Sequence, residues 1–118
     1  MEPRAEQVDE NRGAMDAESE EERKERYRQR LDSKMREWTA QIERLRGRAK
    51  IAEADLKIKY NREIENLGKK KEVVERRLQE LKDSGDEAWE ALKTGTGEAL
   101  FDLRNALKQA RSRLRKGR

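Results

Sequence analysis

Apolar residues recur along the middle of the chain with the spacing of a coiled-coil seam. Over residues 31–56 the stripe advances in alternating steps of four and three residues, which is the heptad pattern. Two successive four-residue steps then end at Tyr60 and Ile64 and shift the register, a change that locally unwinds a supercoil. We therefore predict a long coiled-coil helix over residues 19–83. Its interaction seam comprises Leu31, Met35, Trp38, Ile42, Leu45, Leu56, Tyr60, Ile64, Leu67, Val74, Leu78 and Leu81.

A capping box marks the start of this helix. Ser19 is followed three residues later by Glu22, and in such a box each side chain satisfies a backbone N–H at the helix start. The preceding residues 1–18 contain Pro3 and show no apolar period. Acidic segments without apolar periodicity do not bury enough surface to fold, so we predict a disordered acidic arm over residues 1–18.

The apolar period changes after Leu81. Leucine and alanine positions then repeat every 11 residues, and a base follows each leucine of the repeat. This period, roughly 3.67 residues per turn, is close to that of a straight helix, and its apolar face is wider than a coiled-coil seam. We predict a basic amphipathic helix over residues 84–118. Its apolar face comprises Trp89, Leu92, Leu100, Leu103, Leu107 and Leu114.

Two glycine-containing segments interrupt this region and leave two arrangements open. Gly85 lies beside a second box formed by Ser84 and Glu87, so a helix stop coincides with a restart signal. Either the chain turns near residues 84–86 and forms an antiparallel helical hairpin, or one very long helix bends there. The coincidence favours the hairpin. The glycines at 95–97 predict a hinge, because they lack the strand and the spacing of a phosphate-binding loop.

Composition indicates an all-α protein with a thin core and no active site. Of 118 residues, 47% are charged and 32% are hydrophobic, whereas ordinary domains are about half apolar and a quarter charged. The chain has no His and no Cys, which removes imidazole bases, thiolates and the usual zinc ligands. We expect no catalytic residue, cofactor, metal or small-molecule substrate. The many carboxylate–base pairs are typical of an exposed, salt-bridged helix face.

The predicted hairpin has more apolar seam than it can cover. A helix over residues 86–116 would cover at most half of the long helix, so part of the segment 31–52 would stay in water. Burial by a second copy, or by another coiled-coil protein, would remove this exposure. The leading functional hypothesis is therefore a non-enzymatic structural or interaction protein that forms a homo-oligomer.

Charge varies along the chain and indicates a second class of partner. Residues 1–22 have a net charge of −7, and residues 88–118 have a net charge of +5. Such a basic end can bind an anionic membrane surface or the phosphates of nucleic acid, or it can simply match the helix dipole. Of the two binding hypotheses, peripheral membrane binding comes first and nucleic acid is less favoured, because no motif for base recognition is present. The basic patch comprises Lys108, Arg111, Arg113, Arg115, Lys116 and Arg118.

The aromatic residues of the C-terminal region fit either of these settings. Trp89 and Phe101 are predicted to pack on a helix face, with anchoring at the headgroup level as the alternative. No stretch approaches the about 20 apolar residues of a transmembrane helix, and the first residues lack a secretory leader pattern. We therefore expect a soluble cytoplasmic protein that binds at most to the membrane periphery.

Two segments of the C-terminal half carry a resemblance. Residues 88–95, AWEALKTG, and residues 98–108, EALFDLRNALK, resemble the C-terminal signature of small bacterial coiled-coil proteins, including a cyanobacterial stress-response group. The resemblance covers about residues 34–110 and implies an all-helical, non-enzymatic protein linked to stress. The 11-residue period is also similar to that of exchangeable apolipoproteins. The acidic arm and the Arg-rich end depart from the family pattern.

Overall fold

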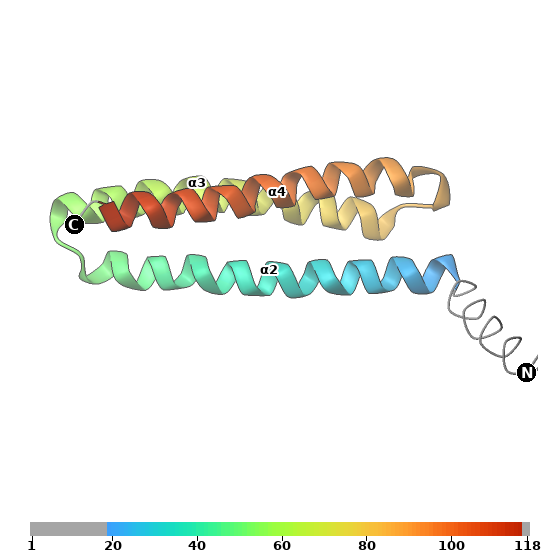
Figure 1. Ribbon diagram of the computed structural model, residues 1–118, viewed down its shortest axis with the longest axis horizontal. Helices are drawn as coiled ribbons and strands as arrows, with labels where there is room; N and C mark the ends of the chain where they lie inside the picture. The colour runs from blue at the N-terminus through green and yellow to red at the C-terminus, as the bar shows by residue number, and fades with distance from the viewer. Residues whose placement is uncertain (1–18, 117–118) are drawn as a thin grey trace, which may run out of the picture. The chain divides into compact units, whose positions relative to one another are not determined.

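The computed structural model describes residues 19–116, and the arm predicted over residues 1–18 lies outside this range, as do residues 117–118. The described residues form helices α2 (Glu20–Ile51), α3 (Ala54–Asp83) and α4 (Asp86–Lys116), without any strand (Figure 1). The predicted all-α fold is therefore confirmed. The chain divides into two units, residues 1–30 and residues 31–118.

The described part of the first unit is the start of α2. The backbone N–H of Glu22 donates to the Oγ of Ser19 at 3.1 Å, as the predicted capping box requires. Acidic residues occupy the first turn, where they interact favourably with the helix dipole. Burial raises the pKa of Tyr27 above 10.0, while the positive charge of Arg30 acts in the opposite direction.

The long helix predicted over residues 19–83 is wrong in one respect, because the chain breaks between α2 and α3. Glu53 is extended, with φ −66° and ψ 161°, and its carbonyl accepts the first hydrogen bond of α3 from the N–H of Lys57 at 2.7 Å. The seam around the break is weak, since it contains only Ala49, Ala52 and the half-buried Leu56. When α2 folds back on the other helices, its larger seam residues become buried. The free energy of this packing outweighs the preference of the short segment 52–53 for a helical conformation.

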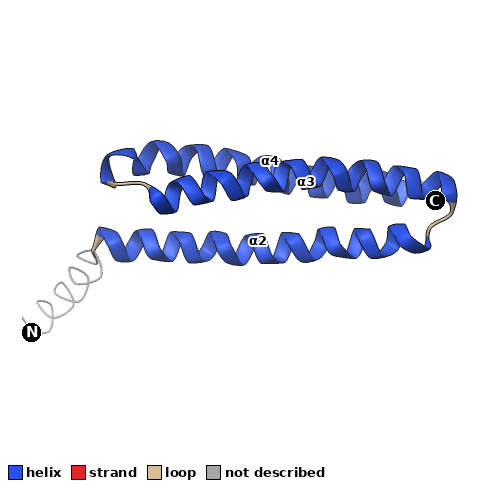
Figure 2. Cartoon of the chain, turned by 180° about the vertical axis from the view of Figure 1, so that it is seen from behind, coloured by secondary structure: helices blue, strands red, loops and turns tan. Residues whose placement is uncertain are grey.

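The second unit is held together by side chains from its three helical segments. Figures 1 and 2 show α3 and α4 side by side and antiparallel, with the 31–51 part of α2 running along them. The apolar stripes of all three segments are buried, so most of the seam is covered within a single chain. The buried residues are Leu31, Met35, Trp38, Ile42, Leu45, Ala49, Tyr60, Ile64, Leu67, Val74, Leu78, Leu81, Trp89, Ala99, Leu103, Ala106, Leu107, Ala110 and Leu114.

The turn between α3 and α4 confirms the predicted antiparallel hairpin. Ser84 is extended, and its Oγ donates to the carbonyl of Leu81 at 2.7 Å. This side chain therefore caps the end of α3, whereas the sequence predicted that it would pair with Glu87 at the start of α4. The acidic residues Asp86 and Glu87 occupy the first turn of α4 and suit its dipole.

The predicted hinge at residues 95–97 is wrong, because α4 is continuous through both glycines. Thr96 between them is fully buried, and its hydroxyl donates to the carbonyl of Leu92 at 2.7 Å within the same helix. The same oxygen lies 3.4 Å from the carbonyl of Arg77 on α3. Packing against α3 thus holds this stretch helical despite the cost of two glycines.

Candidate functional site

One end of the second unit concentrates positive charge, and we call it the basic pole. It consists of residues 44–62, around the α2–α3 connection, and residues 104–116 at the end of α4. Together these two segments carry 13 Lys and Arg residues and two acidic ones, whereas residues 72–93 around the other turn carry seven acidic and four basic residues. Both views place the end of α4 beside the α2–α3 connection (Figures 1 and 2). The unit is therefore electrically polarised.

Two large aliphatic side chains lie exposed within the basic pole. Ile51, the last residue of α2, is 86% exposed, and Ile58, in the second turn of α3, is 58% exposed. Single exposed apolar residues are normal on a protein surface. Here, however, two exposed isoleucines flank one connection and follow the exposed bases Lys50 and Lys57 in the chain, which gives the pole an amphiphilic character.

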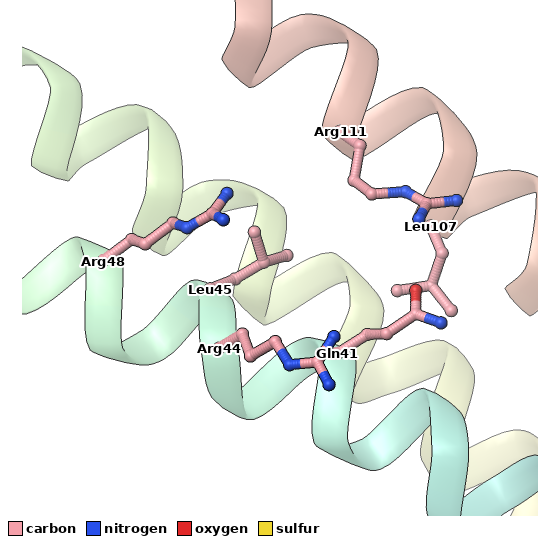
Figure 3. Close-up of a pocket in the computed structure, with 6 residues that line it drawn as sticks. All are labelled: Gln41, Arg44, Leu45, Arg48, Leu107 and Arg111. Atoms are coloured by element: carbon pink, nitrogen blue, oxygen red, sulfur yellow. The ribbon is translucent and has the colours of Figure 1, made fainter.

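A groove lies between α2 and α4 beside this connection. Its two adjoining parts have volumes of about 180 Å³ and 310 Å³. The floor is apolar and consists of buried side chains of all three helices. The floor residues are Leu45, Tyr60, Leu107 and Leu114. Figure 3 shows Leu45 and Leu107 facing the space between the two helices.

Four arginines border the groove in two matching pairs. Arg44 and Arg48 lie one turn apart on α2, and Arg111 and Arg115 lie one turn apart on α4. Like charges four residues apart destabilise a helix by about 0.2–0.5 kcal/mol per pair. No ion pair or hydrogen bond joins these four side chains to any other residue that the structure describes. Their charge is therefore available to an external anion.

An unsatisfied polar atom lies at the same place. Gln41 lines the groove one turn before Arg44 and Leu45 (Figure 3). Its Oε1 atom is buried and has no hydrogen-bond partner among the described residues. Buried polar atoms are nearly always hydrogen-bonded to protein or to water, and solvent in the groove can supply the partner of this acceptor.

The predicted basic patch is only partly brought together. Arg111 and Arg115 border the groove and Lys108 is exposed. Arg113 instead pairs with Glu63 of α3, with Nη1 and Oε1 3.0 Å apart. The side chain of Lys116 and the whole of Arg118 lie outside the described residues. The patch therefore contributes two arginines to the groove and one to a contact between helices.

The predicted interaction seam and amphipathic face both form the core. All the seam residues are buried except Leu56, which is half-buried. On α4, Leu92 and Leu100 are half-buried and the rest of the predicted face is buried. Trp89 packs in the core as expected, but Phe101 is 62% exposed, so the prediction that it packs on a helix face is wrong. Lipid contact through this face would require the helices to separate.

Two features of the sequence correspond to the pole. Arg44 and Arg48 flank the seam residue Leu45 at four-residue spacing, and bases at such positions border whatever the seam packs against. Ile51 and Ile58 are apolar residues outside the stripe. These features form one site only when the helix breaks between Ile51 and Ile58, because the break brings α4 beside α2.

Two further observations concern metal ligands and membrane-spanning helices among the described residues. Among them, no three His, Cys, Asp or Glu side chains gather in a way that could hold a metal ion. No helix in the described range is long and apolar enough to cross a membrane. The basic pole can bind a partner through the charge of its bases and the apolar contact of its exposed isoleucines.

Comparisons with known proteins do not add a function. Protein-family models, curated proteins and solved structures yield no match to this chain. The resemblance to small bacterial coiled-coil proteins therefore stays a prediction.

Proposed function

We propose that this chain is a non-enzymatic interaction protein whose basic pole binds anionic membrane surfaces. The observation that carries the proposal is the exposure of Ile51 and Ile58 among the bases of the pole. Stable attachment to a membrane without a spanning helix needs two signals, an apolar anchor and a cluster of bases. The pole supplies both at one end of the second unit.

The energies of the two signals are comparable. Each Lys or Arg close to an anionic leaflet contributes about 1 kcal/mol. Burying an isoleucine side chain contributes about 1.5–3 kcal/mol when it is complete, and both isoleucines are exposed enough to realise much of this. Because the core stays closed in this mode, binding requires no change in helix content.

A membrane fits the pole better than nucleic acid does. A nucleic-acid backbone would use the bases, but it offers no apolar partner for Ile51 or Ile58. Binding of single strands uses aromatic side chains on which bases stack. The exposed aromatic residue Phe101 lies in the middle of α4, outside the two segments of the pole.

Flotation with lipid vesicles tests the proposal. We expect the full chain to float with vesicles of phosphatidylcholine and phosphatidylglycerol and to stay unbound with phosphatidylcholine alone. Raising the salt from 0.1 M to 1 M shortens the screening length from about 10 Å to 3 Å, so binding should fall steeply. Failure to float with anionic vesicles at low salt would refute the proposal.

Matched substitutions separate the apolar signal from the charge. Replacing Ile58 by Ser should weaken binding about tenfold, which corresponds to about 1.4 kcal/mol. Phe101→Ser is the control, because it removes a similarly exposed apolar side chain outside the pole. Equal losses in the two variants would mean that exposed apolar surface in general, and not the pole, drives binding.

Self-association is a second candidate function. It was predicted because the seam of a two-helix hairpin would be partly uncovered, whereas here the apolar stripe from Leu31 to Ala49 is buried within the chain. A homo-oligomer therefore needs a surface other than the seam. The link to stress rests on the family resemblance alone and is likewise a proposal.

A further inference from the structure

We infer that the groove between α2 and α4 is a binding site for the phosphomonoester headgroup of a membrane lipid. This inference rests on the proposed membrane function and assigns it a specific ligand. The groove combines four arginines with a closed apolar floor, and two exposed isoleucines lie at the same end of the unit. A general attraction to negative charge requires only the first of these features.

The arginines select the charge and shape of the headgroup. A guanidinium presents N–H donors in a planar fork that matches two phosphate oxygens. A phosphomonoester carries about 1.5–2 negative charges and three terminal oxygens, whereas a phosphodiester carries one charge. Each part of the groove is bordered by three of the four arginines, drawn from both helices, and can therefore satisfy a monoester more fully than a diester.

The exposed isoleucines select a lipid over a free phosphate compound. Leu45, Leu107 and Leu114 are buried and close the base of the groove, so they do not reach acyl chains. Ile51 and Ile58 are exposed at the same end of the unit, where the membrane that supplies the headgroup can bury them. An inorganic or sugar phosphate gains nothing from these side chains.

The groove also bears a cost that a bound anion would remove. Each arginine pair places like charges one turn apart, and neither pair has a neutralising partner among the described residues. Natural sequences tend to break such local rules at functional sites. Elsewhere in the unit exposed bases do find acidic partners, as Arg46 does with Glu43 at 3.2 Å and Lys82 with Asp32 at 3.1 Å.

Vesicle binding at matched surface charge tests the inference. Vesicles of phosphatidylcholine would contain either phosphatidic acid or about twice the mole fraction of phosphatidylglycerol, since a monoester carries about twice the charge. We expect the full chain to prefer phosphatidic acid about tenfold, which corresponds to about 1.4 kcal/mol. Equal binding to the two vesicles would overturn the inference and leave the proposed membrane function standing. Binding to neither would refute the proposed function itself.

Two charge-matched double variants locate the preference. Arg48→Gln with Arg111→Gln removes one arginine from each side of the groove and should abolish the preference for phosphatidic acid. Lys57→Gln with Lys59→Gln removes the same charge from exposed positions of α3 that do not line the groove, and should weaken binding to both vesicles while keeping the preference. Identical behaviour of the two double variants would overturn the assignment to the groove.

Two further binding measurements distinguish the possible sources of the phosphate group. Glycerol 3-phosphate carries the same monoester without acyl chains, and titration into the full chain should give much weaker binding than phosphatidic acid in vesicles. Comparable affinity would assign the groove to a soluble phosphate compound and overturn the lipid inference. Tighter binding of a DNA duplex than of the vesicles at the same salt would also overturn it, in favour of nucleic acid.

Discussion

The two glycines in the middle of α4 allow a sharp test of helix continuity. A β-carbon added at Gly95 or Gly97 would meet no atom within 4 Å, and neither residue has a positive φ. Replacing both by alanine should therefore cause no clash. Glycine inside a helix is about 0.8–1.0 kcal/mol less favourable than alanine, so the double variant should be about 2 kcal/mol more stable.

This gain corresponds to a large shift in melting temperature. The entropy of unfolding is about 2.1 cal/mol/K per residue, so a chain of this length should gain about 8 °C. Thermal unfolding followed by circular dichroism at 222 nm measures it directly. The control is Ala91→Gly, at an exposed position of the same helix, which should lower stability by about 1 kcal/mol.

An unchanged or lower melting temperature in the double alanine variant, with the control behaving as expected, would contradict the structure. It would mean that residues 95–97 are not helical in solution and that the hinge predicted from the sequence exists. The continuous helix predicts a rise in melting temperature and the hinge predicts no rise, so the direction of the change separates them.

Two further predictions concern the core. Because the seam is buried within one chain, the melting temperature should not change over a 100-fold range of protein concentration. For a dimer the free energy of unfolding would change by about 2.7 kcal/mol over that range, which is about 5 °C because the entropy of unfolding is that of two chains. Replacing the fully buried Leu67 by Ala should cost about 2–5 kcal/mol in a denaturant titration. The same change at the exposed Ile58 should cost at most about 0.5 kcal/mol, and similar losses at the two positions would contradict the assignment of the core.

Much of the fold followed from the period of the apolar residues. The alternating steps of the seam identified nearly every buried residue, since a stripe of that period must face other helices. The hairpin turn followed from Gly85 and Ser84, although Ser84 caps α3 and not α4. These features depend on local sequence, and local sequence is what a periodicity argument detects.

The break between α2 and α3 could not be predicted in the same way. No Pro or Gly lies between Ile51 and Ala54, and Glu53 has no side-chain cap. What distinguishes the broken from the continuous helix is the burial gained when residues 31–49 pack on the hairpin. The register shift at Tyr60 and Ile64 was the available signal, because a change of phase in the stripe also marks the start of a separate helix.

The site was missed for the same reason. Arg48 and Arg111 are 63 positions apart and come together only because α2 folds back. The sequence placed the basic patch on α4 alone, and it could not show that Arg113 would turn to Glu63. A groove between two helices requires the arrangement of both.

The central claim, that the basic pole is the surface that meets the membrane, is tested most directly by a label at each end of the second unit. The chain contains no cysteine, so Ile51→Cys and Glu87→Cys each provide a single attachment point for an environment-sensitive fluorophore. On addition of anionic vesicles we predict brighter, blue-shifted emission from the label at position 51. The emission of the label at position 87 should change neither in intensity nor in wavelength. A response at position 87 alone, or at neither position while the labelled protein still floats with the vesicles, would contradict the claim.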